Sequence, residues 1–348
     1  MRVLVNGRFL TQQPAGVHRY AFEICRALAE QGVDILVLAP NKPFYQKELP
    51  FPVERVGRTA SHLWEQVELP LYVRRRYRGA LLVNFAGLSP ILYNNCVTTI
   101  HDLSFLENPQ WFSRGYRWWY RMMTPLSARR ARRIITVSEF SKREIVRFLG
   151  VAQEKILVAY NAVADDMAVG KAPEHKDYVL AVSSIDPRKN LSRLLEAFRE
   201  VNHPDVQLVV VGARNRVFAD VDGLEANDKR ITFVGYLDSE ALAAYYANAK
   251  IFVYPSLYEG FGIPVLEAMH FGCPVLVSDI PPLHEVADEA ALYCNPLDTH
   301  SIAAQLERLL GDEDLRSRLV EQGRERCCRF SWRESAAKIY NMLRTLEA

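Results

Sequence analysis

Two glutamates flank a glycine-rich turn in the second half of the chain, in the stretch SLYEGFGIPVLEAMHFG, residues 256–272. Glu259 lies in the turn, and Glu267 lies three residues after Pro264. A proline suits the first position of a helix because its missing N–H would be unpaired there anyway, and the preceding Ile263 is expected to be extended. We therefore predict a helix that starts at Pro264 and carries Glu267 in its first turn.

The glycines of this turn allow a ligand to approach the backbone closely. The N–H groups of Phe261, Gly262 and Ile263 are expected at the start of the helix, where oxygen-rich or anionic groups bind. Two carboxylates repel a phosphate, but they accept hydrogen bonds well from the paired hydroxyls of a sugar or a ribose. The structural alternative is that Glu267 complements the helix dipole and Glu259 caps a turn.

The alternation of elements around this stretch predicts an α/β fold with two doubly wound, Rossmann-like domains. Residues 1–10, 16–32 and 33–40 read as strand, amphipathic helix and strand, which is typical of the start of a parallel sheet. A second series of strands begins near residue 177. We predict one domain from residues 1–164 with the terminal helix 331–348, and another from residues 165–330. Ligands are then expected in a cleft at the carboxyl ends of the strands.

Composition indicates an ordinary soluble protein with more than one core, because the chain has 348 residues, of which 49% are hydrophobic. The net charge is +2, but residues 1–170 carry +9, which predicts an anionic partner for the first half. The six cysteines form no CxxC pair and no zinc-like spacing with histidine. We find no secretory signal and no bilayer-length apolar run, so we expect a cytoplasmic protein.

Further motifs follow in the order GVHRY, HDLSF, VSEFSK, PRKN, GYLDSEAL, the two-glutamate stretch, PPLHEVADEAALYCNP and FSWRESA. As a set they resemble the retaining glycosyltransferases of family four, which have the GT-B fold. The details are most similar to a bacterial subgroup of mannosyl- and rhamnosyltransferases that build O-antigen and other surface polysaccharides. The resemblance implies transfer of a hexose, without metal or other cofactor, from a nucleotide diphosphate sugar to a glycan or lipid-linked glycan. It also implies that the domain of residues 1–164 and 331–348 lies on the acceptor side and that the domain of residues 165–330 binds the nucleotide sugar. Guanosine diphosphate mannose is the favoured donor.

The leaving diphosphate needs positive charge, and without a metal the protein must supply it. The resemblance implies that Lys189 of SSIDPRKN has this role, beside Arg188. Many family members carry an arginine about five residues earlier, where this chain has Ser183 and Ser184. The second positive contact is therefore open between Arg188 and the N-terminal loop. That loop places Gly16 before the first helix, as a backbone cradle for the diphosphate or the sugar.

The resemblance assigns further contacts with the donor. His101 of HDLSF contacts the transferred sugar near its reacting carbon, and Asp102 is expected to orient it. Glu259 holds sugar hydroxyls and is not assigned as a nucleophile. A retaining enzyme with a carboxylate nucleophile would place two carboxyl groups about 5 Å apart. Glu267 contacts the ribose. The base pocket is expected to include Tyr236 and Leu237 of GYLDSEAL.

Residues 111–133 mix aromatic side chains with arginines, and residues 72–79 add four more arginines. A lipid-linked acceptor would bring this surface to the cytoplasmic face of a membrane, where such a mixture binds anionic headgroups. The alternative is an aromatic face packed in the core with a solvated basic face. No nucleic-acid recognition motif accompanies the charge.

Two DxD triplets, at residues 220–222 and 312–314, resemble metal sites of a different glycosyltransferase fold, but neither follows a strand, and we expect solvated loops or helix starts. Other functions stay open: a sugar-nucleotide epimerase, a phosphorylase, which would need a longer chain, and a non-catalytic subunit that binds a nucleotide sugar or a glycan. A dehydrogenase is disfavoured because no GxGxxG follows the first strand.

Overall fold

The computed structural model describes residues 2–13, 16–46, 48–164, 167–174, 177–212 and 228–346. The chain divides into two compact units. Unit 1 consists of Met1–Leu106, Trp118–Asn161 and Ser331–Ala348, and unit 2 consists of Glu107–Arg117 and Ala162–Phe330. Residues 107–117, which we expected in the first domain, thus group with unit 2, and the division falls at residues 161 and 162 rather than at 164 and 165.

Unit 1 is built on a seven-stranded sheet in the order β3-β2-β1-β4-β5-β6-β7, with every pair parallel. The strands are β1 (Val3–Asn6), β2 (Ile35–Pro40), β3 (Val53–Val56), β4 (Leu82–Asn84), β5 (Cys96–Thr99), β6 (Arg133–Thr136) and β7 (Ile156–Val158). The chain moves outward from β1 in one direction and then from β4 in the other. The order of strands therefore reverses between β1 and β4, which is where open α/β sheets bind ligands.

The helices of unit 1 follow the strands in the alternation that the sequence predicts. They are α1 (Gly16–Glu30), α2 (Leu69–Arg76), α3 (Ser104–Glu107), α4 (Arg114–Arg130), α5 (Glu139–Leu149) and α12 (Trp332–Arg344), with the first residues of α4 and the last of α3 assigned to unit 2. Three 3-10 turns, η1 (Arg8–Thr11), η3 (Pro109–Trp111) and η4 (Gln153–Lys155), and a π-helical turn, η2 (Trp64–Glu68), complete this part of the chain.

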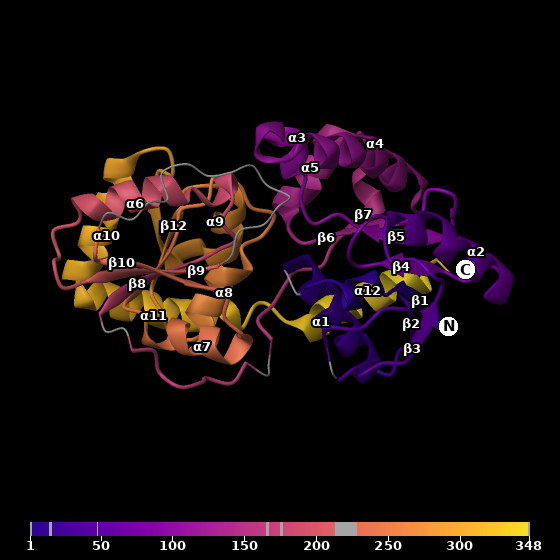
Figure 1. Cartoon of the computed structure of the whole chain (residues 1–348), viewed down its shortest axis with the longest axis horizontal. Coiled ribbons are helices and arrows are strands. Elements are labelled where there is room, and N and C mark those ends of the chain that lie inside the picture. Colours follow the sequence, from indigo (N-terminus) through magenta and orange to yellow (C-terminus); the bar gives the residue numbers. More distant parts are fainter. Residues whose placement is uncertain are drawn as a thin grey trace. The chain divides into compact units, whose positions relative to one another are not determined.

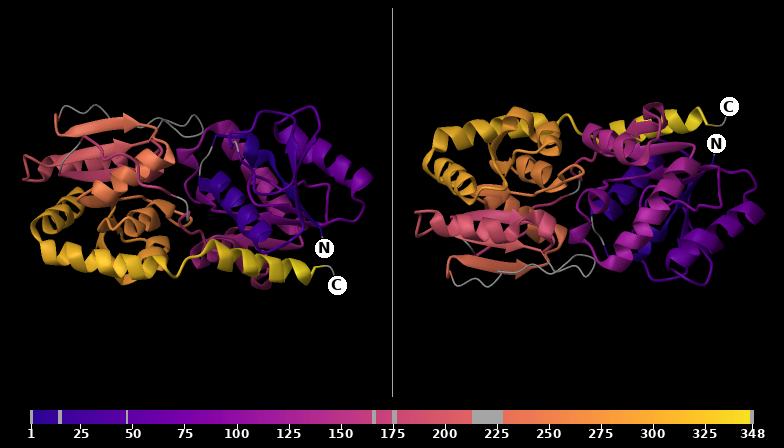
Figure 2. Two further views of the ribbon diagram at one scale, coloured as in Figure 1. Left: turned by 90° about the horizontal axis from the view of Figure 1, so that it is seen from below. Right: turned by 90° about the horizontal axis from the view of Figure 1, so that it is seen from above.

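The C-terminal helix α12 packs against α1 and lies along unit 1 in both views of Figure 2. The Ser331 hydroxyl accepts a hydrogen bond from the Glu334 N–H and so caps the helix at the residue where the predicted terminal segment 331–348 begins. Two further bonds hold the helix: Ser335 Oγ donates to the carbonyl of Tyr160 at 2.8 Å, and the Gln31 side chain donates to the carbonyl of Arg333 at 2.9 Å. The last helix of the chain is therefore part of the first unit.

Unit 2 is built on a six-stranded parallel sheet in the order β10-β9-β8-β11-β12-β13. Its strands are β8 (Tyr178–Val182), β9 (Gln207–Val211), β10 (Ile231–Gly235), β11 (Ile251–Tyr254), β12 (Val275–Ser278) and β13 (Ala291–Cys294). Its helices are α6 (Leu191–Glu200), α7 (Ser239–Asn248), α8 (Ile263–His270), α9 (Pro281–Ala287), α10 (Thr299–Gly311) and α11 (Glu313–Cys327), with 3-10 turns η5 (Pro187–Lys189) and η6 (Asp288–Ala290). Here the order reverses between β8 and β11.

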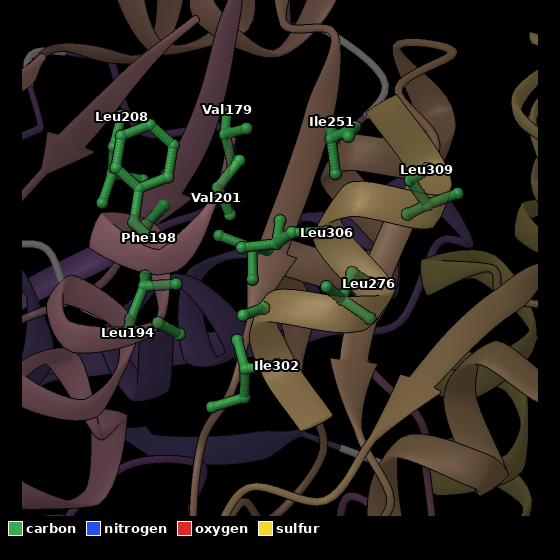
Figure 3. Close-up of a cluster of buried hydrophobic side chains, with 14 of the residues drawn as sticks. Val179, Leu194, Phe198, Val201, Leu208, Ile251, Leu276, Ile302, Leu306 and Leu309 are labelled. Carbon is green, nitrogen blue, oxygen red and sulfur yellow. The ribbon is translucent and has the colours of Figure 1, made fainter. Parts of the chain in front are cut away.

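In unit 2, α6 and α10 pack together on one face of the sheet, and α7, α8 and α11 lie on the other (Figure 1). The apolar stripes of α6 and α10 meet the strands in a core whose side chains are almost completely buried (Figure 3). It includes Leu194 and Phe198 of α6, Ile302, Leu306 and Leu309 of α10, and Val179, Leu208, Ile251 and Leu276 of the strands. Burial of each such side chain contributes about 1.5–3 kcal/mol, so this core holds α6 and the turn that precedes it on the sheet.

The sheets confirm the predicted fold class, two doubly wound α/β units. Near-continuous apolar runs form the strands because both faces of each sheet are covered. None of the helices in the described ranges has the length and apolarity required to cross a bilayer.

Candidate active site

A buried ion pair lies at the carboxyl ends of β8 and β11 in unit 2. Lys189 Nζ is 2.6 Å from Glu259 Oε1 and donates a second hydrogen bond to the hydroxyl of Tyr254, also at 2.6 Å. Only 11% of the lysine side chain and 10% of the glutamate side chain are exposed. Lys189 ends the turn after β8, whereas Tyr254 ends β11 and Glu259 follows it. The reversal point between the two strands thus joins two motifs that are 70 residues apart.

The surroundings of Lys189 keep it charged. Burial lowers the pKa of Lys189, but the Glu259 carboxylate and Tyr254 raise it by more, so that its pKa lies above the ordinary lysine value. Burial, and then Glu259, raise the pKa of the Tyr254 phenol, which therefore stays protonated at neutral pH. The site holds one ammonium and one carboxylate, both largely shielded from water, beside a neutral hydroxyl.

The turn that carries Lys189 is organised by a buried aspartate. Asp186 accepts hydrogen bonds from the backbone N–H of Arg188 at 3.0 Å and from its Nε at 3.1 Å. The Ser184 hydroxyl donates to the other carboxylate oxygen of Asp186 at 2.7 Å. The Arg188 guanidinium is therefore paired with Asp186 and lies 5.8 Å from the ring centre of Phe112. Ser184, one of the two serines at the place where the family resemblance implies an arginine, supports this turn.

Asn190 fixes the same turn to the end of β11, a role that the sequence analysis did not assign. It adopts a left-handed conformation with φ of 58° between the turn and α6. Its side-chain amide donates to the carbonyls of Pro255, at 3.0 Å, and Pro296, at 2.6 Å. The backbone N–H of Leu257 also donates to the carbonyl of Arg188 at 2.7 Å. An asparagine between a turn and a helix is the one local signal, since asparagine tolerates positive φ.

The glycine turn leads into α8, but the helix begins at Ile263 and not at Pro264 as predicted. Gly262 is the N-cap residue with φ of 114°, which turns the chain so that Ile263 enters the helix directly despite the proline that follows. Glu267 therefore lies in the second turn of α8, and the prediction of a first-turn glutamate is wrong. The φ of 114° favours glycine at this position, and a Cβ there would also lie 2.8 Å from Leu283 Cδ2, which would have to shift.

Glu267 is buried and faces α7 through the hydroxyl of Tyr246, which donates to its Oε2 at 3.0 Å. The Tyr246 ring stacks on Phe271, with the ring centres 6.1 Å apart. Phe261 is also buried and packs edge-on against Phe330 at 5.6 Å. Both ends of the glutamate motif are thus anchored by side-chain contacts within unit 2.

Tyr236 and Leu237 lie at the same carboxyl edge, directly after β10. Tyr236 is 60% exposed and Leu237 is half-buried. Asp238 then begins α7 by accepting a hydrogen bond from the Ala241 N–H at 2.9 Å. Among the described residues, neither Tyr236 nor Leu237 makes a hydrogen bond or ring contact with the pair of Lys189 and Glu259.

In unit 1, His101 follows β5 and is held by backbone and ring contacts. Its Nε2 donates to the carbonyl of Phe85 at 2.9 Å, and its ring lies edge-on to Tyr20 at 5.0 Å. Burial lowers the pKa of His101, although the Phe85 carbonyl and Asp102 oppose this. The main-chain carbonyl of His101 accepts the hydroxyl of Ser141 at 2.9 Å. The histidine is therefore neutral at pH 7.

Asp102 uses Oδ1 to accept the N–H and the hydroxyl of Ser104, at 2.9 and 2.6 Å, and its charge acts on the His101 ring, which donates to the Phe85 carbonyl. Gly16 is the exposed first residue of α1, and residues 14 and 15 of its loop lie outside the described residues. The DxD triplet 220–222 also lies outside them, and Asp312 of the second triplet caps α11. The described part of the chain contains no cluster of three or more histidine, cysteine, aspartate or glutamate side chains suited to a metal ion.

Two family models match the chain. The model "Glycosyltransferase Family 4" matches residues 14–166, and the model "Glycosyl transferases group 1" matches residues 163–326.

Among curated relatives, the O-antigen chain mannosyltransferase RfbU of Salmonella typhimurium is 30% identical over 325 residues, which cover 88% of this chain and 90% of that protein. The O-antigen chain mannosyltransferase B of Escherichia coli is 29% identical over 275 residues, covering 74% of this chain and 72% of that protein. Among solved structures, a sucrose-phosphate synthase from Thermosynechococcus elongatus superposes with a TM-score of 0.79 at 21% identity, covering 99% of this chain and 98% of the other. This last similarity concerns the fold alone.

Proposed function

The chain belongs to the family 4 glycosyltransferases, and we propose that it transfers a mannosyl group from guanosine diphosphate mannose to a hydroxyl of a glycan or lipid-linked glycan. The names of the two O-antigen mannosyltransferases support the sugar and the surface polysaccharide as its destination. We further propose that the configuration at the transferred carbon is retained and that no metal ion takes part.

The observation that carries this proposal is the ion pair of Lys189 and Glu259 at the reversal point of the unit 2 sheet. When the bond to the sugar breaks, negative charge grows on the diphosphate, and a fixed positive charge in a site with little water stabilises it strongly. Lys189 has that charge at neutral pH because Glu259 and Tyr254 hold its pKa high. Glu259 thereby fixes the lysine, and we propose that it also accepts a hydroxyl of the transferred sugar.

The other residues proposed to contact the donor in unit 2 also lie at the carboxyl edge of its sheet. The N–H groups of Phe261, Gly262 and Ile263 precede or begin α8, and we propose that they bind the diphosphate. One carboxylate oxygen of Glu267 accepts a hydrogen bond from the Tyr246 hydroxyl. We propose that the same carboxylate also accepts a hydrogen bond from the ribose. The exposed ring of Tyr236 is proposed, with Leu237, to contact the base.

Three further roles rest on the family resemblance. Arg188 is the proposed second positive group, although its guanidinium is paired with Asp186. In unit 1, Gly16 is proposed to contact the donor through the start of α1, and His101 is proposed to contact the transferred sugar as a neutral imidazole.

The test combines donor binding with turnover. Guanosine diphosphate mannose, uridine diphosphate glucose and thymidine diphosphate rhamnose are compared by thermal shift, because a ligand at a hundred times its Kd adds about 2.7 kcal/mol to stability. Release of the nucleoside diphosphate is then measured with a panel of octyl glycosides as acceptors. We expect guanosine diphosphate mannose to give the largest shift and to support turnover.

Lys189→Gln is expected to lower kcat by about 10²–10³-fold, as when one stabilising group is removed from a charged transition state. Lys250→Gln is the matched control, because Lys250 forms a more exposed ion pair with Asp177 in the same unit. Turnover within twofold of wild type for Lys189→Gln contradicts the mechanism. Binding of the donor by wild type with no turnover on any acceptor favours a non-catalytic subunit.

We also propose a peripheral contact between unit 1 and anionic lipid at the cytoplasmic face of a membrane. The predicted alternative placed the aromatic residues of the 111–133 segment in the core; Trp111 and Phe112 are buried there, whereas Trp118 is 66% exposed. Exposed apolar side chains recur at every fourth residue on two helical segments, η2–α2 and α4. These are Leu63, Val67 and Leu71 on the first segment and Trp118, Met122 and Leu126 on the second.

Both helices end in arginines, at residues 74–76 and 129–130, which supply charge for anionic headgroups. Trp118→Ser is expected to reduce sedimentation with phosphatidylglycerol vesicles, with Leu297→Ser, an exposed leucine of unit 2, as the matched control. Equal sedimentation of both variants and wild type contradicts this contact.

A further inference from the structure

Unit 1 contains a buried polar cluster at its own reversal point, and none of the motifs above includes it. Asn6 is the last residue of β1 and Asn84 is the last residue of β4, and both are fully buried. The Asn6 side-chain amide donates to Asn84 Oδ1 at 2.8 Å and to Glu65 Oε1 at 3.0 Å. The cluster thus occupies the place in this sheet that the pair of Lys189 and Glu259 occupies in unit 2.

Glu65 is a fully buried carboxylate on the π-helical turn η2. It accepts hydrogen bonds from Arg8 Nη1 at 3.0 Å and from His62 Nδ1 at 3.2 Å. Burying a carboxylate is costly even when it is paired, and apolar side chains of similar volume often pack with equal or greater stability. π-Helical turns are rare and are frequently found at functional sites. Stability of the fold is therefore a weak explanation for this arrangement.

The cluster lies close to the surface. Gly87, in the loop after β4, is exposed and has φ of 80°. A Cβ on this residue would lie 2.7 Å from Glu65 Oε1, so a side chain at this position would press on the carboxylate. At the carboxyl ends of the strands, the backbone of the exposed Gly87 therefore lies next to the polar cluster, with no side chain between them.

His62 gives the cluster an exposed polar atom. Its side chain is 36% exposed, and within the described part of the chain its Nε2 has no hydrogen-bond partner, while Nδ1 faces Glu65. The ring lies 5.3 Å from that of Trp119 and 6.3 Å from that of Tyr120, both on α4. A free polar atom among aromatic rings is typical of small-molecule sites, in which a few polar groups fix the orientation of the ligand.

We propose that Arg8 and His62 bind hydroxyls of the acceptor sugar and that Glu65 is a positioning residue that holds both. The ion pair of Arg8 and Glu65 has no net charge, which suits an uncharged polyol better than a phosphate. The imidazole Nε2 forms one hydrogen bond with an acceptor hydroxyl, and the Arg8 guanidinium, partly exposed, donates to another. This proposal rests on the proposed function, since transfer of a glycosyl group requires an acceptor with a free hydroxyl.

The first experiment measures binding of octyl α-mannoside, octyl α-rhamnoside and octyl β-N-acetylglucosaminide to the full chain without donor, by saturation-transfer NMR and calorimetry. We expect at least one glycoside to bind wild type and to bind about tenfold more weakly to His62→Ala, the loss of roughly one hydrogen bond with its packing. His300→Ala, which truncates an exposed histidine of unit 2, is the matched control and is expected to bind like wild type.

The second experiment separates positioning from support of the fold. Glu65→Gln keeps the shape of the side chain but removes its charge, and we expect it to raise the KM for the glycoside with little change in the KM for the donor. His62→Gln, which is closer in volume, replaces His62→Ala if the alanine variant does not fold. A role limited to the fold would change the unfolding transition and leave the ratio of the two KM values as in wild type.

The outcomes are distinct. Absence of binding by all three glycosides to wild type, or equal binding by both His62 variants and wild type, overturns the proposed acceptor site. Donor binding is followed separately with guanosine diphosphate mannose and Lys189→Gln. Failure of that nucleotide sugar to bind wild type contradicts the proposed donor and leaves the glycoside measurements valid as a test of His62.

Discussion

The buried pair of Lys189 and Glu259 makes a quantitative prediction about stability. Glu259→Gln removes the negative charge and leaves the buried Lys189 ammonium without an opposite charge. Lys189→Met removes the positive charge and leaves the buried Glu259 carboxylate without one. Removing one partner of a buried ion pair costs about 3–5 kcal/mol. With 2.6 Å between the charged atoms and about nine-tenths of each side chain buried, we expect each single variant to lie in that range.

The destabilisation of the double variant Lys189→Met/Glu259→Gln is expected to be smaller than the sum of the two single destabilisations by at least about 2 kcal/mol. The reason is that neither charge is then left unpaired. Four of the five tryptophans belong to unit 1. Tryptophan fluorescence therefore reports mainly the unfolding of unit 1, whereas the pair of Lys189 and Glu259 lies in unit 2. Hydrogen exchange of peptides from β8 and β11, measured against urea concentration, reports the free energy of unfolding of unit 2 directly.

The same pair predicts a dependence on pH. Because the pKa of Lys189 is higher in the folded than in the unfolded chain, its contribution is fully present below the ordinary value of 10.5 and is lost as the pH rises above it. Wild type should therefore lose stability in unit 2 above about pH 10.5 more steeply than Lys189→Met. Additive single effects in the double variant, or identical pH profiles, would refute the idea that the two charges stabilise each other.

Other positions give further predictions. Gly262→Ala is expected to destabilise unit 2 by about 1–3 kcal/mol, since φ is 114° and the new Cβ meets Leu283; an unchanged melting temperature contradicts this. Tyr246→Phe removes the hydroxyl that donates to the buried Glu267 Oε2 and is expected to cost about 1–3 kcal/mol, measured by hydrogen exchange of α7 and α8; exchange rates equal to those of wild type contradict it. The lowered pKa of His101 means that unit 1 loses stability as the pH falls below about 6.5, because the unfolded chain binds the proton more readily; His101→Gln should flatten this profile in tryptophan fluorescence, and an unaltered slope contradicts it.

Much of the architecture was accessible from local pattern. Apolar runs between amphipathic helices predicted parallel sheets covered on both faces, and Ser331 marked the start of the terminal helix correctly. Errors occurred where a neighbouring residue overrode a local preference. The proline rule placed the start of α8 at Pro264, yet the left-handed conformation of Gly262 lets Ile263 begin the helix. The sequence also could not name the acceptor of the His101 ring hydrogen bond, because that acceptor is the backbone carbonyl of Phe85 and a carbonyl carries no sequence signal.

Residue types and their spacing were sufficient to recognise the glutamate motif, the basic turn at Lys189 and the family to which they belong, because these signals lie within short stretches of chain. Several partners in these sites are far apart in the sequence: Asn6 is 59 residues from Glu65 and 78 from Asn84, and Lys189 is 70 residues from Glu259. Such pairs meet because parallel strands place their carboxyl ends at one edge, and strand order is set by packing of the whole sheet. Burial of Glu65 and the charge of Lys189 depend on that packing, which no local pattern specifies.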